Sequence, residues 1–243
     1  MPDATETRTA TRERIVAVAA RLLDEHGPAA VTTRAVAEGA AVQAPTIYRL
    51  FGDKDGLLEA VAEHVMARHV EAKTETERAA VARDGDPVDD LRHSWLAQID
   101  FGLANPAVFR LLSEPSRVLS SPAAQAGQRV LGSRVHRVAA TGRLRVGEQR
   151  AVDLVQAAGV GVITTLLTTP ARQRDPDLPE AMLQTVLAQV LTDAPGSGGE
   201  GGDDDRTVTA AVTLRAAVAG LDVLTEGERR LLGEWLDRVV AAS

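Results

Sequence analysis

Apolar residues recur with a helical period along most of the chain. Between Thr11 and His26 they fall three and four residues apart, which places them on one face of a helix, and Gly27 and Pro28 then follow in the order that ends one. No run of alternating Val, Ile and Thr bounded by turn residues interrupts this pattern, so we expect no strand. The pattern predicts an all-α chain of about nine to eleven helices. The main stripes are Ile15, Val18, Ala19, Leu22, Leu23; Leu58, Val61, Ala62, Val65; Leu91, Trp95, Ile99; Leu154, Val155, Ala158, Val162, Leu166; and Leu183, Val186, Leu187, Val190, Leu191.

The helical pattern is interrupted once by a low-complexity segment. Residues 195–206 are rich in Gly and Asp, a composition typical of a flexible, solvated linker. The remaining part, 207–243, predicts a C-terminal helical extension, because Thr225 and Glu228 fit a capping box ahead of an apolar stripe that includes Trp235 and Val239. That stripe needs to be buried, either on its own chain or on a partner.

Residues 32–51, TTRAVAEGAAVQAPTIYRLF, predict two short helices joined by a tight turn. Thr32 or Thr33 caps a helix that ends near Gly39, Ala40 to Gln43 form the turn, and a second helix runs from about Ala44 to Leu50. Pro45 fits the first turn of that helix, where N–H groups have no intrahelical partner. This is the geometry of a helix-turn-helix, whose second helix lies in the DNA major groove.

The block from Thr11 to about Ala62 resembles the DNA-binding domain of TetR-family transcriptional regulators. The features that carry this resemblance are Ile15, Ala19, Leu22, Leu23, Gly27, Thr32, Thr33, Ala35, Val36, Ala37, Val42, Tyr48, Phe51, Lys54, Leu57 and Leu58. The chain departs from the family pattern at three positions: Ala41 stands where Gly is usual in the turn, Gln43 where Ser is common, and Gly56 where Glu often supports the next helix.

The resemblance implies an N-terminal three-helix helix-turn-helix domain followed by a C-terminal helical ligand-binding and dimerisation domain. We accordingly expect a flexible arm at 1–10, a DNA-binding domain at 11–72 and an effector-binding and dimerisation domain at 73–194. The implied function is that of a sequence-specific DNA-binding regulator in the cytoplasm, associated with the nucleoid when bound to DNA. The resemblance further implies a ligand-released repressor that acts as a homodimer on a palindromic operator of double-stranded DNA, with an unidentified small molecule as its effector.

The chemistry of the side chains suggests how the DNA is contacted. Gln43 suits adenine, Arg49 suits guanine or a phosphate, and Lys54 follows Asp53 at a helix N-terminus, where a phosphate is favoured. Apolar side chains can contact a thymine methyl, and hydroxyls suit phosphate or base oxygens. Ile47 and Phe51 are expected to be core residues instead. The predicted DNA-binding residues are Thr33, Arg34, Gln43, Ala44, Pro45, Thr46, Tyr48, Arg49 and Lys54.

In the second domain, the family implies that two helices, here about Glu148–Thr168 and Pro179–Thr192, pair with a second subunit, and Ala157, Ala158, Gly159 and Gly161 would let them approach closely. An intramolecular core is the alternative.

Half of the chain's six aromatic residues gather within fifteen positions and, with nearby polar groups, predict an apolar effector pocket, although they are equally compatible with ordinary core. The candidate effector-binding residues are Arg92, His93, Trp95, Gln98, Phe101 and Phe109.

Composition and charge exclude several classes of protein. The chain has 243 residues, 44% of them apolar, and no cysteine, which rules out disulfide scaffolds and thiolate metal sites. Its net charge of −7 argues against non-specific coating of nucleic acid, and residues 1–56 carry 7 basic and 8 acidic side chains, so charge gives no independent support for DNA binding. The N-terminus lacks the apolar segment of a secretory signal. The longest uncharged stretch, Leu154 to Ala171, holds several Thr and a Pro and is interpreted as a buried helix, so no membrane partner is expected.

Catalytic and metal-binding motifs are not found in the sequence. HExxH, GxSxG and phosphate-loop patterns are missing, and Asp89 and Asp90 are adjacent, so on a helix they diverge and are expected at a solvated helix start. His64 and His69 are five residues apart and do not share a helical face, so we expect neither a metal nor another cofactor. We therefore expect a protein that is not an enzyme. The alternative is a helical small-molecule-binding or catalytic protein with a vestigial DNA-binding domain.

Overall fold

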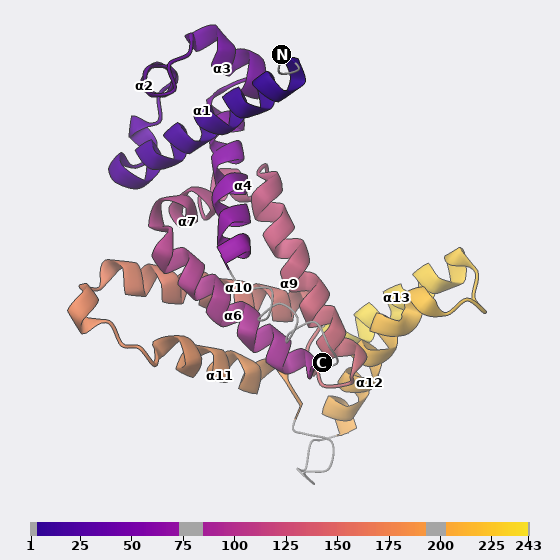
Figure 1. Ribbon diagram of the computed structural model, residues 1–243. Helices are drawn as coiled ribbons and strands as arrows, with labels where there is room; N and C mark the ends of the chain where they lie inside the picture. The colour runs from indigo at the N-terminus through magenta and orange to yellow at the C-terminus, as the bar shows by residue number, and fades with distance from the viewer. Residues whose placement is uncertain (1–3, 73–84, 193–202, 243) are drawn as a thin grey trace. The chain divides into compact units, whose positions relative to one another are not determined.

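The computed structural model describes residues 4–72, 85–192 and 203–242, which are helical almost throughout (Figure 1). No strand occurs in these ranges, where a single isolated bridge pairs Leu144 with Leu191, so the prediction of an all-α chain is confirmed. The α-helices are α1 Ala4–His26, α2 Thr33–Gly39, α3 Ala44–Phe51, α4 Lys54–Ala72, α6 Pro87–Ala104, α7 Pro106–Leu112, α8 Pro115–Val118, α9 Pro122–Ala140, α10 Glu148–Thr168, α11 Leu178–Val190, α12 Asp203–Ala217 and α13 Glu226–Ala241.

Proline marks the start of many of these helices. Pro87, Pro106, Pro115 and Pro122 are the first residues of α6, α7, α8 and α9. A proline at this position loses no hydrogen bond, because the first N–H groups of a helix have no partner within it, and its fixed φ angle already matches the helix. The breakers between the apolar stripes are therefore the points at which new helices begin.

The described residues form two compact units. One comprises 4–72 and 100–127, and the second comprises 85–99, 128–192 and 203–242. Residues 100–127 thus pack with the N-terminal helices, whereas the sequence placed a functional boundary between 72 and 73. That functional boundary stays a prediction.

The first unit is built on one apolar core that joins α1, α2, α3 and α4 to α7 and to the start of α9. Its best-shielded members include Ile15, Val36, Ile47 and Val61, each at most 2% exposed. At about 25 cal/mol per Å² of apolar surface removed from water, each such aliphatic side chain stabilises the fold by about 1.5–3 kcal/mol. The core residues are Ile15, Val16, Val18, Ala19, Leu23, Val31, Val36, Ala37, Ala40, Ile47, Leu57, Leu58, Ala60, Val61, Ala62, Ala107, Val108, Leu111 and Ala123.

In the second unit, α6 packs against α10 and α11 through Trp95. Its indole is buried, and Nε1 donates a hydrogen bond to the carbonyl of Pro179 at 3.0 Å. Gly159 of α10 lies under the ring, where an added Cβ would be 3.4 Å from it. Gly159 therefore serves close packing within the chain and is not available for the approach of a second subunit.

A buried carboxylate joins α6 to α9. Asp90 is 8% exposed, accepts a hydrogen bond from Arg134 Nε at 3.2 Å and is paired with Arg137. The expectation of a solvated Asp89–Asp90 pair was therefore wrong for Asp90, because two arginines from another helix compensate the cost of burying its charge. Nearby, Arg143 donates to Asp86 at 2.6 Å and thereby lowers the pKa of that carboxyl.

Two helices begin earlier than expected. The sequence predicted a flexible arm at 1–10, but α1 already begins at Ala4, because no Gly or Pro stands between Ala4 and Thr11 to stop the helix. Likewise α12 begins at Asp203, inside the predicted linker 195–206, where the acidic residues favour the positive end of a helix dipole. The remainder of that linker up to 202 lies outside the described residues.

By length and composition alone, α10 could cross a membrane. Its most apolar window has a mean hydropathy of 1.6, and a third of that window is buried. A single helix of this kind is also typical of a protein core. Of the predicted stripe, Val155, Val162 and Leu166 are buried, whereas Leu154 and Ala158 are half-buried.

Candidate nucleic-acid interface

Helices α2 and α3 with the turn between them form the predicted helix-turn-helix. The side chain of Thr32 caps α2 by accepting a hydrogen bond from the backbone N–H of Ala35 at 3.2 Å. After the turn, Val42 N donates to the carbonyl of Ala37 at 3.0 Å, which closes the chain back on α2. Helix α3 starts at Ala44 and stops at Gly52, whose φ of 79° is accessible to glycine without strain.

The turn contains a strained residue. Ala41 has a φ of 52°, in the left-handed region that disfavours every residue with a Cβ. This is the position at which the family pattern usually has Gly. Ala41 in place of Gly therefore keeps the left-handed geometry of the turn, at a cost in backbone strain.

Helix α3 is anchored through one side. Ile47 is 2% exposed, and Leu50 and Phe51 are half-buried against the same core, which confirms the expectation for Ile47 and Phe51. The guanidinium of Arg12 lies over the Phe51 ring, 5.4 Å from its centroid, so α1 also holds the end of α3. No local pattern predicts this contact, because the two residues lie far apart in the chain.

The opposite side of α3 is open to solvent. Pro45, Tyr48 and Arg49 are exposed there, and Tyr48 is 55% accessible, so its ring and hydroxyl can be reached by a ligand. Thr33 Oγ1 of α2 lies 3.5 Å from Tyr48 Oη, so the two helices present hydroxyls side by side.

The other predicted DNA-binding residues are accessible as well. Arg34, Gln43 and Lys54 are exposed, and Thr33, Ala44 and Thr46 are half-buried. Across the described residues, no acidic side chain forms an ion pair with Arg34, Arg49 or Lys54. Three exposed cations, on α2, α3 and the start of α4, are thus available to an anionic ligand.

The junction between α3 and α4 is closely fitted. Asp53 caps α4 by accepting the N–H of Gly56 at 2.7 Å, which places Lys54 in the first turn as predicted. A Cβ at Gly56 would clash with the carbonyl oxygen of Phe51, the last residue of α3. The Glu that the family often has here does not fit this junction, and Gly56 is required by the close approach of the backbone.

Helix α4 is also tied to the segment that follows α7. The carboxylate of Glu59 accepts the backbone N–H of Ala123, in the first turn of α9, at 2.6 Å. A cleft of about 810 Å³ lies beside this contact, and it is lined by Pro28, Asp53, Lys54, Asp55, Gly56, Leu58, Glu59, Leu111, Glu114, Ser116, Ser120, Ser121 and Pro122. Sequence reasoning missed Glu59, because a side chain that caps a helix 64 positions away leaves no local pattern.

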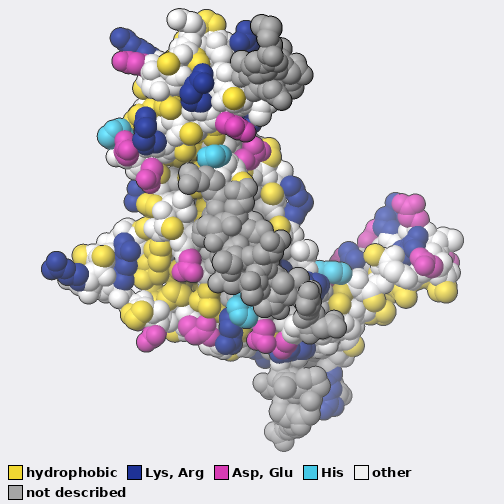
Figure 2. All heavy atoms as spheres, in the orientation of Figure 1, with side chains coloured by type: hydrophobic (Ala, Val, Ile, Leu, Met, Phe, Trp, Pro, Cys, Tyr) yellow, Lys and Arg dark blue, Asp and Glu magenta, His cyan; other side chains and the backbone are white. Residues whose placement is uncertain are grey.

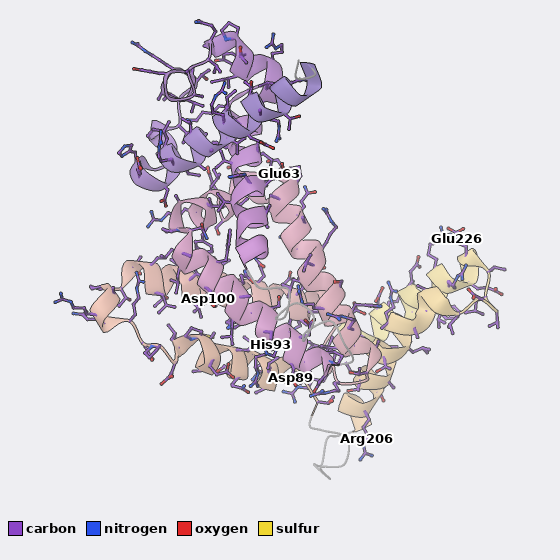
Figure 3. All side chains as sticks on the ribbon, in the orientation of Figure 1. Glu63, Asp89, His93, Asp100, Arg206 and Glu226 are labelled. Carbon is purple, nitrogen blue, oxygen red and sulfur yellow. The ribbon has the colours of Figure 1, made fainter. Side chains whose placement is uncertain are left out.

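The six candidate effector-binding residues divide between the two compact units. Arg92, His93, Trp95 and Gln98 belong to one, and Phe101 and Phe109 to the other. Arg92 pairs with Glu180 at 3.3 Å, and the exposed His93 ring lies against the carbonyl of Asp89 at 2.7 Å (Figure 3). A common effector pocket for these six stays a prediction.

The N-terminal part of the chain matches a known family. The model for bacterial regulatory proteins of the tetR family matches residues 15–61. The chain is 34% identical over 93 residues to the HTH-type transcriptional regulator BetI of Paraburkholderia phytofirmans, and 31% identical over 128 residues to BetI of Burkholderia thailandensis. The first alignment covers 38% of this chain and 46% of the relative, and the second 47% and 66%. The chain thus spans less than two thirds of the curated relatives it matches.

Solved structures share the fold. A tetR family transcription regulator from Shewanella sp. PV-4 superposes with a TM-score of 0.58 at 19% identity, covering 75% of this chain and 99% of that one. The fatty acid degradation regulator FadR of Bacillus halodurans gives 0.57 at 18%, covering 72% and 94%. SmeT, the repressor of the multidrug efflux pump SmeDEF of Stenotrophomonas maltophilia, gives 0.51 at 27%, covering 80% and 98%.

The strain at Ala41 predicts a stabilising substitution. Ala41→Gly relieves the left-handed conformation at an exposed position, so we expect the free energy of unfolding to rise by about 0.5–1 kcal/mol in a urea titration. Gly52→Ala is the matched control, because Gly52 also has a positive φ and an added Cβ meets nothing within 4 Å. Gly52→Ala is expected to lower the free energy of unfolding. A change in the same direction for both variants would contradict the strain at Ala41.

The close approach of the backbone at Gly56 predicts a destabilising substitution. Gly56→Ala forces the junction between α3 and α4 to open, so we expect a loss of about 2 kcal/mol or more in unfolding free energy. Gly127→Ala, at an exposed position of α9 where a Cβ has open space, is expected to be neutral or stabilising by up to about 1 kcal/mol. Unfolding curves that coincide for Gly56→Ala and the wild type would refute the close approach.

Proposed function

The chain belongs to the TetR family of bacterial regulatory proteins, and from this membership we propose that it is a homodimeric repressor that binds a palindromic operator and releases it when a small molecule binds. The observation that carries the proposal is the helix-turn-helix at 33–51, whose second helix buries Ile47 and exposes Pro45, Tyr48 and Arg49. A protein with this role is not an enzyme, and it acts in the cytoplasm, where the DNA is.

Base reading is assigned to the start of α3. Gln43 makes paired hydrogen bonds to adenine, and Arg49 bonds guanine or a phosphate. Ala44 and Pro45 contact a thymine methyl group, and the hydroxyls of Thr46 and Tyr48 bond base or phosphate oxygens. Positioning on the backbone is assigned to Thr33 and Arg34 of α2 and to Lys54 at the positive end of α4.

Dimerisation is assigned to α10 and α11. The exposed positions of α10 from Ala157 onward are small, namely Ala157, Gly161, Thr164, Thr165 and Thr168, and a Cβ at Gly161 would meet nothing within 4 Å. Small side chains allow two helices to approach closely. Two copies related by a two-fold axis then offer two copies of α3 to the half-sites of a palindrome.

Effector control is assigned to α4. This helix carries Lys54 at its start and Glu59, which caps α9, in its second turn. A ligand that favours one position of α9 over another therefore changes the position of α4 and of Lys54. Binding of effector and of operator are then coupled reciprocally, as linkage requires.

Two substitutions separate the proposed DNA-contact roles. With DNA selected by the wild-type protein from a random-sequence pool, Lys54→Ala is expected to weaken binding to all sequences alike and to lower the slope of log K against log salt by about 1, whereas Gln43→Ala mainly relaxes base preference. Arg110→Ala is the control, because it removes one exposed charge from α7 of the same unit. Equal loss of specificity in both variants contradicts the assigned roles, and selection of no sequence at all overturns the regulator proposal.

A charge placed on α10 tests the dimer. Gly161→Arg puts a long cation into the proposed contact, so light scattering is expected to give the 25.7 kDa monomer at concentrations at which the wild type has twice that mass or more. Gly127→Arg on α9 is the control, since that position is exposed and open as well. A wild-type protein of 25.7 kDa at micromolar concentration contradicts the proposal directly.

A further inference from the structure

The C-terminal helices α12 and α13 form a well-fixed hairpin within the second unit. Thr225 and Glu228 make the capping box that the sequence predicted, and the same contacts lower the pKa of Glu228. Arg215 of α12 donates to Asp237 of α13 at 3.0 Å, and its guanidinium lies over Gly233, where an added Cβ would be 3.3 Å from it. The relative placement of the two helices is therefore defined by side-chain contacts.

This hairpin carries most of the large hydrophobic residues that are exposed among the described positions. Of the eight large hydrophobic residues that are exposed among the described positions, five lie on it: Leu214, Val223, Leu231, Trp235 and Val239. Figure 2 shows hydrophobic side chains along one edge of the hairpin and charged ones along the other. The half-buried Leu232 and Leu236 continue the apolar face inward. An amphipathic stripe of this kind is expected to be covered by a partner.

The exposed residues of α13 are arranged symmetrically about Trp235. Leu231 precedes it by one helical turn and Val239 follows by one, and the three are 43%, 53% and 38% exposed. If two copies of α13 pack antiparallel about a two-fold axis at Trp235, Leu231 of each copy faces Val239 of the other. The stripe is therefore complementary to itself, which a two-fold interface requires.

The charges beside the stripe fit the same arrangement. Glu234 and Arg238 lie along one edge of it, 4.0 Å apart within the helix. In an antiparallel pair that edge meets its own copy with the direction reversed, so Glu234 of each chain faces Arg238 of the other. If the two helices packed parallel, the edge with Glu234 and Arg238 would instead face the other edge of the second helix, and neither ion pair between the chains would form.

The charge balance disfavours anionic partners. Helix α13 carries four acidic residues and three arginines, so its net charge is −1. Nucleic acid and anionic lipid surfaces select a basic face. A mixed face of near-zero charge suits a second copy of this chain.

We propose that α13 of one chain packs antiparallel on α13 of a second copy, with Trp235 at the two-fold axis, as a contact separate from the α10–α11 pairing of the proposed function. Trp235 is the central apolar anchor, Leu231 and Val239 flank it, and the Glu234–Arg238 pairs set the direction. The contact either extends the DNA-binding dimer or joins two dimers, and the mass of the cross-linked species distinguishes these.

The absence of cysteine makes the register directly testable in the full-length chain. Leu231→Cys carrying an affinity tag is mixed with untagged Val239→Cys and oxidised. We expect the disulfide between the two variants to form about tenfold faster than the one between two Leu231→Cys chains, whose sulfurs are about 12 Å apart along the helix axis. Ala241→Cys is the matched control, because this exposed position lies on the side of α13 that carries Gly233 and Asp237, opposite the stripe, and it is expected to cross-link with neither.

Three results overturn the proposal: no cross-link, equal cross-linking of all pairs, or a preference of Leu231→Cys for itself. The mixed cross-link is expected to persist in the Gly161→Arg background and without DNA, so that failure of the proposed dimer or of operator binding is distinguishable from failure of this contact. Trp235→Arg in the same assay is expected to abolish the cross-link, and its unfolding curve reports whether the hairpin itself survives.

Discussion

The position of α3 depends on Ile47, its only buried side chain. All eight residues of this helix are described, and apart from Ile47 only half-buried neighbours touch the core. A short helix held at one point can rotate about it, so the flanking contacts determine which residues face outward. The cap of α2 at Thr32, the return of Val42 to α2, the Arg12–Phe51 contact and the Gly56 junction supply these contacts on both sides. The polar face of α3 is thus a consequence of the packing of its apolar one.

The core that receives Ile47 extends beyond the helix-turn-helix. Val108 and Leu111 of α7 and Ala123 of α9 belong to the same cluster, and Glu59 adds a polar contact from α4 to the start of α9. Closely packed interiors transmit displacement because they cannot deform at low cost. If a ligand shifts α9, as the proposed function requires, this continuity is a physical route from α9 to Lys54, and the hydrogen bond at Glu59 is the most direct part of that route.

The parts of the structure that the sequence predicted are those that depend on local chemistry. Thr32, Asp53 and the capping box at Thr225 act within four residues of their own position, and Ile47 follows from helical period. The burial of Asp90 by Arg134 and Arg137 and the capping of α9 by Glu59 join distant segments, and no periodicity encodes them. Ala41 is intermediate: its departure from the family pattern was visible in the sequence, but only the backbone angle shows that the left-handed turn is retained. The grouping of Trp95 with Phe101 and Phe109 had no local basis beyond proximity in sequence, and the fold assigns them to different units.

Net charge is a poor guide to nucleic-acid binding in this chain, for a reason visible in the distribution of its charges. Asp24 and Glu25 stand at the end of α1 and Glu38 at the end of α2, whereas Arg34 and Lys54 stand at the beginnings of α2 and α4. The near-neutral N-terminal region therefore still offers unpaired cations beside the exposed face of α3. If Arg34, Arg49 and Lys54 are the residues that neutralise phosphates, the proposed dimer neutralises six of them, which gives a slope of log K against log salt of about −5. Binding of that moderate electrostatic strength has to draw its specificity from the base contacts of α3, which is consistent with an acidic protein that recognises a sequence without coating DNA.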